Sequence, residues 1–154
     1  MSRRAEIRLS ADEQRELIAT ERIVVVSTIG PRGWPHSMPL WYVPRDGEVW
    51  IYTYARSQKV RNLERDPRAT LLVETGHEYG ELRGVEIEAE AQIHREHAAV
   101  FELAKELTVR YADGADVDEA AAEALRAQAR KRVAIHFQSR RVATWDHRKL
   151  GGRY

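Results

Sequence analysis

The sequence predicts an α+β fold that is mainly β: a small antiparallel barrel or strongly curled sheet with helices at its ends. Two features of the 154-residue chain support this prediction: five or six short segments rich in β-branched residues, and few long crossovers between them. The chain has about the length of one ordinary domain and contains no repeat, low-complexity tract or Pro/Ser-rich linker. We therefore expect a single domain over residues 1–154.

The elements before residue 55 are expected to be one helix and three strands. Ser10, followed three residues later by Glu13, is typical of a capping box, so a short helix begins there. Strands are expected over residues 22–30, 35–43 and 48–54, because turn sequences separate them at 30–33 and 44–47. The third strand is expected to direct one row of side chains away from the core: Trp50, Tyr52 and Tyr54.

The later elements alternate between strands and helices. A short helix from residue 57 ends before Pro67, and strands over 69–75 and 84–93 follow. Glu86, Glu88 and Glu90 alternate with apolar residues, which indicates a solvated strand face rather than a row of catalytic carboxylates. Apolar residues near helical spacing predict two helices over 96–112 and 116–131, and the chain then returns to strands at 132–138 and 141–146.

Composition limits the possible functions. Lys and Arg number 25 against 24 Asp and Glu, so a net charge of +1 provides no global field to attract nucleic acid or a membrane surface. The absence of cysteine excludes disulfides, thiolate nucleophiles and cysteine-ligated zinc. The N-terminal segment MSRRAEIRLSADEQREL lacks the apolar core of a signal peptide, and no long apolar run occurs. We therefore expect a cytoplasmic protein that binds neither nucleic acid nor membrane.

The motifs of three common kinds of active site are missing. His94 and His97 lie three apart, but they span a strand end and a helix start without further ligands, so we predict no metal site. Asp146 and His147 have no G-x-S-x-G nucleophile, which argues against a Ser/His/Asp hydrolase. No G-x-G-x-x-G or Walker-type loop follows a strand, which argues against Rossmann and P-loop nucleotide sites.

The segment YARSQKVRNLERDP, residues 54–67, is the strongest candidate site. The start of a helix carries about half a positive charge, so nearby cations normally cost a few tenths of a kcal/mol. Here the expected start at Ser57 is surrounded by Arg56, Lys59 and Arg61. A bound phosphate would reverse this penalty, because free N–H groups and cations would then share one ligand. The alternative is a set of ordinary surface cations, with Arg61 paired to Glu64 and Lys59 in water.

This segment and its neighbours resemble a known family. The run VWIYTYARSQKVRNLERDPRATLLVE is similar to the core of the pyridoxamine 5'-phosphate oxidase-like, FMN-binding split-barrel superfamily, which includes the actinobacterial flavin/deazaflavin oxidoreductases. GWPHSMPLWYV and GEVWIYTY resemble its two cofactor-facing strands, and RVATWDHRKL resembles its last strand, so the resemblance spans about residues 20–150. It implies a six-stranded antiparallel split β-barrel with flanking helices, and a homodimer with cofactor sites at the interface.

The resemblance also implies which residues bind the cofactor. Tyr52 and Thr53 match the family's Tyr-Thr beside the phosphate and ribityl chain, and Lys59 matches the phosphate-binding lysine. Around that lysine we expect further contacts from Arg56, Ser57, Gln58 and Arg61. One edge of the flavin ring would lie along the backbone of Met38, Pro39, Leu40 and Trp41. Trp145 corresponds to a late tryptophan that comes from the partner subunit.

Two departures from the family's pattern concern the cofactor and the substrate. Gln58 stands where the vitamin-pathway oxidases have an arginine, so the phosphate site has one cation fewer. The sequence HRKLGGRY replaces the Arg-rich tail that holds pyridoxal, so pyridoxamine phosphate is not the expected substrate. The resemblance therefore favours the deazaflavin branch, with coenzyme F-420 as cofactor and FMN as the alternative. The acidic tail of coenzyme F-420 would suit basic residues such as Arg56, Arg61 and Arg65.

The expected activity depends mainly on that cofactor. A reduced deazaflavin or flavin passes a hydride to a small conjugated acceptor, while the protein supplies position and anion contacts. We name no catalytic residue, although His36 or His77 could donate a proton. Two other functions stay open: a non-catalytic flavin- or haem-binding split barrel, with His77 as a possible axial ligand, and an RNA-binding barrel with stacking platforms at Trp41, Trp50 and Tyr54.

Overall fold

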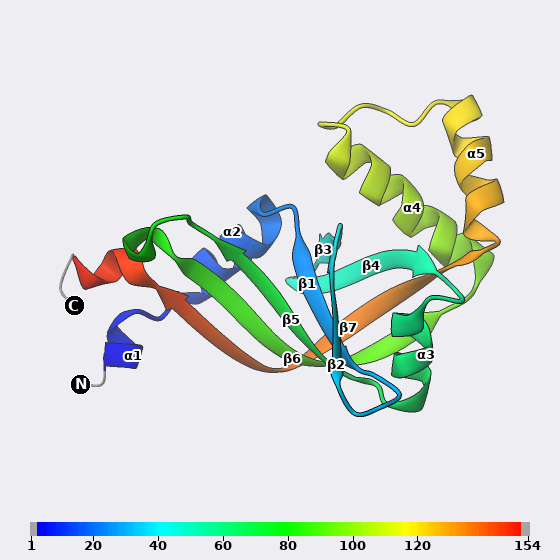
Figure 1. Cartoon of the computed structure of the whole chain (residues 1–154). Coiled ribbons are helices and arrows are strands. Elements are labelled where there is room, and N and C mark those ends of the chain that lie inside the picture. The colour runs from blue at the N-terminus through cyan, green and yellow to red at the C-terminus, as the bar shows by residue number, and fades with distance from the viewer. Residues whose placement is uncertain (1–2, 152–154) are drawn as a thin grey trace.

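The described strands form a single curled antiparallel sheet. The structure is a computed structural model that describes residues 3–151, so the ends of the expected domain, 1–2 and 152–154, lie outside it. The strand order is β2-β1-β5-β6-β7-β4-β3, which leaves β2 and β3 at the edges (Figure 1). The bounds are β1 Val24–Ile29, β2 Pro35–Leu40, β3 Val43–Arg45, β4 Glu48–Tyr54, β5 Arg68–Thr75, β6 Arg83–His94 and β7 Arg132–Asp146.

Helices lie on both sides of this sheet. Their bounds are α1 Arg3–Glu6, α2 Ala11–Thr20, α3 Gln58–Arg65, α4 His97–Tyr111 and α5 Glu119–Ala129, with short 3-10 helices η1 Tyr79–Glu81 and η2 His147–Leu150. The predicted capping box is confirmed, because Ser10 and Glu13 each accept the other's backbone N–H. Helices α4 and α5 pack together beside β3, β4 and β7, whereas α3 follows β4 and packs on β1 (Figure 1).

The expectation of six strands is wrong, because the sheet has seven. The segment expected as one strand over 35–43 breaks after Leu40 into β2 and β3. Tyr42 causes the break: its ring is fully buried, and its hydroxyl donates to the carbonyls of Ile18 (2.6 Å) and Glu21 (2.9 Å) at the end of α2. Reaching those carbonyls takes the chain out of the ladder between the two strands.

The last two expected strands are one continuous strand, β7. The register against β6 shifts between Glu88 and Ala89, where Arg141 pairs with Glu88 but Ser139 pairs with Ala89. Arg140 is therefore the extra residue of a β-bulge, which bends the strand and adds to its twist without ending it. This bend lets β7 pair with β6 along its whole length and with β4 at its first half.

Two apolar clusters lie on opposite faces of β4. Val49 and Ile51 belong to the main core with α2, α3, β1, β5 and β6, whereas Trp50 and Tyr52 pack against the smaller cluster under α4 and α5. The predicted aromatic row thus faces the helical hairpin rather than the main core. Because Thr53 is on the main-core side, β4 delivers a hydroxyl to the same side of the sheet as α3.

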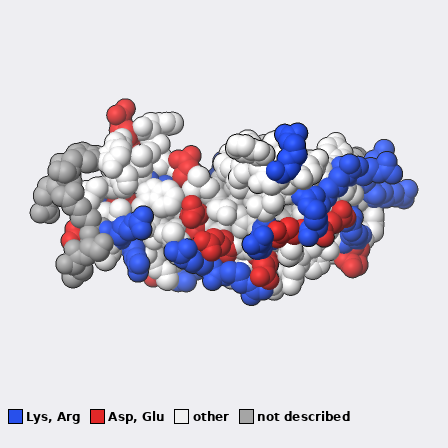
Figure 2. Space-filling view, turned by 60° about the horizontal axis from the view of Figure 1, so that its bottom comes forward, with Lys and Arg blue, Asp and Glu red and all other residues white. Residues whose placement is uncertain are grey.

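The surface shows mixed charge on the face seen in Figure 2, where Lys and Arg side chains lie interspersed with Asp and Glu. The ion pairs of the described residues include Arg140 with Glu90 (2.8 Å) and Arg141 with Glu88 (3.0 Å), so two of the three glutamates in the β6 row pair with β7. No helix within residues 3–151 is long and apolar enough to cross a membrane.

Candidate functional site

The candidate site lies where β4 passes into α3. Ser57 is the N-cap residue of α3 and has the extended backbone of a cap (φ −68°, ψ 156°), yet its side chain makes no capping hydrogen bond. Its Oγ is buried and has no hydrogen-bond partner. Buried hydroxyls are nearly always satisfied, and an N-cap serine normally accepts from the first turn. The start of α3 therefore has free donors and no acceptor of its own.

Lys59 is buried at the same place. Its side chain lies in the first turn of α3 and leaves only 8% of the residue exposed. Nζ donates to Thr53 Oγ1 at 3.1 Å, and within residues 3–151 it forms no ion pair. Burial lowers the pKa of the Lys59 ammonium, because the charged form loses hydration. The alternative of a surface cation in water is wrong for this residue.

The exposed cations at the junction are not neutralised by neighbours. Arg56 and Arg61 are exposed. The suggested partner of Arg61, Glu64, pairs instead with Arg95. No acidic residue occurs in the first turn of α3. The repulsion between these cations and the positive end of the α3 dipole, which the sequence predicted, is therefore present in the fold, and no acidic side chain in the first turn offsets it.

A buried polar network fixes α3 against β1 and includes Gln58. Asn62, which is fully buried, donates from Nδ2 to Thr28 Oγ1 at 3.0 Å and accepts from Gln58 Nε2 at 2.8 Å. Arg65 donates to Asn62 Oδ1 at 3.3 Å and to the Ile29 carbonyl at 2.6 Å. Sequence reasoning missed Thr28 and Asn62. The available signal was the i, i+4 spacing of Gln58 and Asn62, which places both amides on one helix face.

Tyr52 and the residues of β2 are placed differently from Lys59. Tyr52 lies on the opposite face of β4 from Thr53, with the Arg132 guanidinium 4.7 Å from its ring centre and its hydroxyl buried without a partner. Met38 and Pro39 are exposed, whereas Leu40 packs on the main core. The structure thus brings Lys59 and Thr53 together next to Ser57, and it places β2 at one edge of the sheet.

The aromatic residues suggested as stacking platforms already have partners. Trp41 stacks on Tyr111 of α4 with ring centres 4.2 Å apart. Trp50 stacks on His136 at 4.3 Å, with Arg45 also over its ring. Tyr54 is exposed, but Arg132 lies over its ring. Each of these rings thus has a partner within the protein, while Trp41 and Tyr54 remain more than half exposed at 54% and 58%.

Trp145 lies on the outer face of the sheet, beyond both apolar clusters. It pairs with Gly84 across β6 and β7, and its indole covers Gly84 so closely that a side chain there would clash with the ring. The same face carries one row across the paired strands in which Glu86 lies between Leu72 and Ala143, after Pro39 and Val25. None of these residues belongs to either core cluster, so the row is a surface of apolar side chains around one carboxylate, Glu86, outside both cores.

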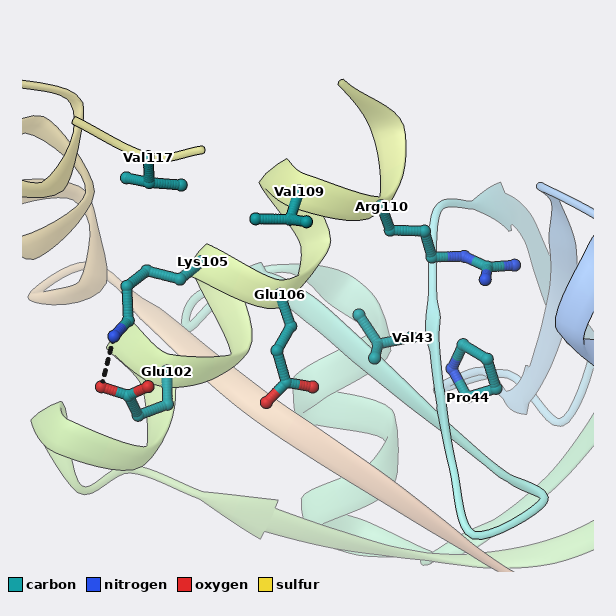
Figure 3. Close-up of a pocket in the computed structure, with 8 residues that line it drawn as sticks. All are labelled: Val43, Pro44, Glu102, Lys105, Glu106, Val109, Arg110 and Val117. Atoms are coloured by element: carbon teal, nitrogen blue, oxygen red, sulfur yellow. Dashed lines mark ion pairs between the residues drawn. The ribbon is translucent and has the colours of Figure 1, made fainter. Parts of the chain in front are cut away.

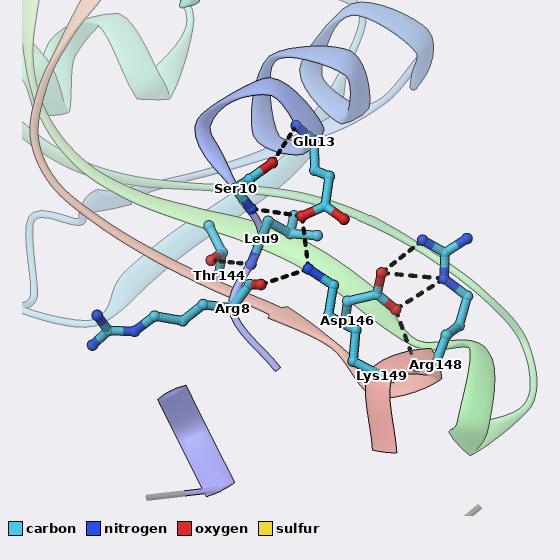
Figure 4. Close-up of polar contacts among 8 residues, drawn as sticks. All are labelled: Arg8, Leu9, Ser10, Glu13, Thr144, Asp146, Arg148 and Lys149. Atoms are coloured by element: carbon cyan, nitrogen blue, oxygen red, sulfur yellow. Dashed lines mark hydrogen bonds and ion pairs between the residues drawn. The ribbon is translucent and has the colours of Figure 1, made fainter. Parts of the chain in front are cut away.

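Asp146 has a structural role in a cluster near the C-terminal end of the described chain. Its carboxylate is 1% exposed and accepts two bonds from the Arg148 guanidinium and one from the Arg148 backbone (Figure 4). Arg148 holds the pKa of this carboxyl below its usual range. Nearby, Lys149 donates to the Arg8 carbonyl and to Glu13, both at 2.7 Å, so this cluster joins the two ends of the described chain.

A separate hollow lies on the other side of the sheet, and most of its charged groups are already paired. It occupies about 630 Å³ on the α4 side of the sheet, with an apolar floor and charged rim made by Val43, Pro44, Glu102, Lys105, Glu106, Val109, Arg110 and Val117 (Figure 3). Lys105 pairs with Glu102 at 2.8 Å and Glu106 pairs with Arg45 at 2.7 Å. The charged side chains around this hollow are thus engaged within the protein, although Nε of Arg110 is buried without a partner.

The two candidate proton donors differ in position. His36 lines a cavity of about 250 Å³ together with Gln58, and its Nδ1 is buried without a partner. His77 is exposed in the loop before η1. Among residues 3–151, no group of three His, Asp or Glu side chains is arranged to hold a metal ion.

Comparisons with known proteins show the family of the chain. The family model for pyridoxamine 5'-phosphate oxidase matches residues 10–146. A conserved hypothetical protein from Mycobacterium tuberculosis has 38% identity and a TM-score of 0.89, with 100% of this chain and 95% of that chain covered. A search of curated proteins finds no match.

Two more distant structures share the fold. An F420 reductase has 21% identity and a TM-score of 0.63, with 83% of this chain and 94% of that chain covered. The haem storage protein HutZ from Vibrio cholerae has 14% identity and a TM-score of 0.66, with 86% and 92% covered. At these identities the likeness concerns the fold alone.

Proposed function

Because the chain belongs to the pyridoxamine 5'-phosphate oxidase family, we propose that it is an oxidoreductase that holds a flavin-type cofactor by its phosphate at the β4–α3 junction. The observation that supports this most directly is the buried Ser57 hydroxyl without a partner, next to the buried Lys59 ammonium. A phosphate would accept from Ser57 Oγ, from the free N–H groups of the first turn and from Lys59. All three kinds of donor suit a phosphate dianion.

We propose coenzyme F-420 as the cofactor, with FMN as the alternative. The first residue of α3 is neutral Gln58, and its amide is engaged with Asn62 rather than offered as a second buried cation. The remaining cations, Arg56 and Arg61, are exposed at the rim, where they suit a cofactor whose further negative charges extend into solvent. The deazaflavin's acidic tail fits this distribution better than the single phosphate of FMN.

The residues of the chain would bind and orient rather than react. When bound, a reduced deazaflavin or flavin supplies a hydride for a conjugated acceptor. Lys59, Ser57 and Thr53 hold the anionic end at a rigid helix start. The open backbone of Met38 and Pro39 gives the ring an edge to lie along. His36 is the better placed proton donor, because it lines a cavity beside Gln58 while His77 is exposed in a loop.

We further propose a homodimer in which the outer sheet face is the interface. The row of Pro39, Val25, Leu72, Glu86 and Ala143, with Trp145 beside it, is apolar except for Glu86 and belongs to neither core cluster. A twofold contact there would be self-complementary and would bury Trp145 against the partner subunit.

The experiment that tests this proposal is a parallel titration of the purified protein with coenzyme F-420, FMN and haemin. Fluorescence quenching measures the two flavin-type ligands, and the absorbance of haemin measures the third. We expect micromolar or tighter binding of coenzyme F-420. Tight FMN binding without deazaflavin binding would reverse the choice of cofactor, haemin binding alone would favour a haem-binding protein, and binding of none would refute the oxidoreductase proposal.

A further inference from the structure

A small cavity next to the candidate phosphate site has a different chemistry. It lies between the β1–β2 turn, residues 30–34, and the start of α3, and its volume is about 250 Å³. This is below the roughly 300–1,000 Å³ of sites that enclose a whole drug-sized ligand or cofactor. The cavity therefore has room for one ring-sized molecule.

The walls of this cavity are basic and flat, with no acidic residue. Arg32 and His36 are its titratable side chains, Gln58 adds an amide, and Trp34, Pro31 and Pro35 supply apolar surface. The Trp34 side chain is an exposed large hydrophobic at 74%, which is unusual for an indole without a partner. A planar ligand with a negative charge matches a guanidinium beside an open indole face.

One wall also contains an unsatisfied polar atom. Nδ1 of His36 is buried and has no hydrogen-bond partner in the protein. Such atoms are rare in folded proteins, and they often mark the place of a ligand or ordered water. The His36 ring is thus available for a ligand in the cavity.

The two walls are held rigidly relative to each other. The turn is closed by Gly30 N–H to the Trp34 carbonyl at 2.8 Å and by Gly33 N–H to the Gly30 carbonyl at 3.0 Å. A side chain at residue 30 would collide with the Trp34 carbonyl, so glycine is required there. Arg65 joins the turn to α3 through the Ile29 carbonyl, at 2.6 Å. A cavity with walls tied in this way is formed before a ligand arrives.

We propose that this cavity binds the carboxylate-bearing end of a planar, conjugated substrate, with Arg32 as the carboxylate partner and Trp34 as the surface on which the ring lies. That this molecule is the hydride acceptor rests on the proposed function, whereas its binding in the cavity does not. The cavity is lined by Gln58, which precedes Lys59 in the chain, so a substrate bound there would lie beside the proposed cofactor. The substrate class is thereby narrowed to small aromatic or conjugated carboxylates.

Benzoate is a suitable probe, because it is planar, anionic and of ring size. Titration of the full chain is followed at the Trp34 indole N–H in ¹H–¹⁵N spectra, with Trp34→Phe used to assign that signal. We expect benzoate to shift the signal saturably, and Arg32→Gln to weaken binding by about tenfold or more, as for loss of a charge-assisted hydrogen bond. Arg130→Gln, an exposed arginine outside the cavity, should leave binding unchanged.

Two analogues of benzoate test separately whether the negative charge and the planar ring are needed for binding. Benzamide tests the charge and cyclohexanecarboxylate tests the flat ring, and both should bind several-fold more weakly than benzoate. Equal binding of benzamide, an unchanged affinity in Arg32→Gln, or no movement of the Trp34 signal would overturn the proposal. Lys59→Met should retain benzoate binding even where it abolishes cofactor binding, so failure of this subsite and failure of the proposed function give different results.

Discussion

Replacing Lys59 by methionine should stabilise the cofactor-free protein while destroying its anion site. The ammonium is buried, and of its three N–H donors one reaches Thr53 Oγ1. An unsatisfied buried charged group costs about 1–3 kcal/mol of stability, which the substitution recovers. The loss of the hydrogen bond to Thr53 offsets about 0.5–1.5 kcal/mol of this recovery. The net stabilisation is therefore about 1 kcal/mol, which raises the Tm of a domain of this size by roughly 2–4 °C.

The same substitution should remove the effect of the ligand on stability. For the natural protein, coenzyme F-420 at 100 times its Kd adds about 2.7 kcal/mol to the free energy of unfolding. Loss of a charge-assisted contact weakens binding by about 1.5–3 kcal/mol. At the same ligand concentration Lys59→Met should then gain no more than about 1.4 kcal/mol. Thermal melts with and without ligand measure both effects.

The pH dependence gives an independent check on Lys59. Burial lowers the pKa of this group in the folded state below its ordinary 10.5, so the folded protein releases the proton first. Stability should therefore rise with pH from the lowered pKa up to about 10.5, and this rise should be absent in Lys59→Met. Lys131→Met, an exposed lysine, is the matched control and should change neither stability nor binding. A lower Tm in Lys59→Met, or retained cofactor affinity, would refute the reasoning.

Three further substitutions test the neighbouring residues. Ser57→Ala removes a hydroxyl that has no partner in the protein, so the Tm of the cofactor-free variant should lie within about 2–4 °C of that of the natural protein. Titrations should show cofactor binding weakened by about 0.5–1.5 kcal/mol, and unchanged affinity would argue against a ligand at that hydroxyl. Gln58→Arg adds a cation at the helix start and should raise FMN affinity more than coenzyme F-420 affinity in side-by-side titrations, whereas equal gains would show that residue 58 does not select the cofactor. Asp146→Asn should lower the free energy of unfolding by about 1–2 kcal/mol at pH 7, because Arg148 loses its charged acceptor. The pKa of Asp146 in the folded protein lies below 3.8, so the stability difference measured by urea unfolding should shrink as the pH falls through that lowered pKa. A difference that does not depend on pH would exclude the ion pair as its cause.

Local sequence patterns predicted the elements whose causes are local. The capping box of Ser10 and Glu13 and the alternation along β4 both depend on residues within a few positions of one another. The break after Leu40 could not be predicted, because it depends on the Tyr42 hydroxyl reaching carbonyls at the end of α2, more than 20 residues away. The bulge at Arg140 is also a tertiary feature, since its position is set by the register of β7 against β6.

In the candidate site, too, local features could be predicted from the sequence and tertiary ones could not. The cations around Ser57 and their conflict with the helix start were readable from the sequence, because both lie within one turn of helix. That Lys59 is buried was not readable, since its burial requires α3 to dock on the sheet and Thr53 to point to the same side. Asn62 was missed for a related reason: its role is to bond Thr28, which lies 34 residues away in the chain.

The start of α3 departs from the usual pattern of a helix N-terminus in three ways, and one bound anion would compensate for all three. Its N-cap hydroxyl accepts nothing from the helix, its first turn contains no acid, and its lysine is buried without a counter-ion within the described residues. Each departure destabilises the cofactor-free fold, and each would be relieved by the same anion, placed against Ser57 and Lys59. Three unrelated defects would each need their own explanation, whereas an anion site explains all of them together. Local rules broken in a consistent direction are expected at functional sites, where stability is given up for binding.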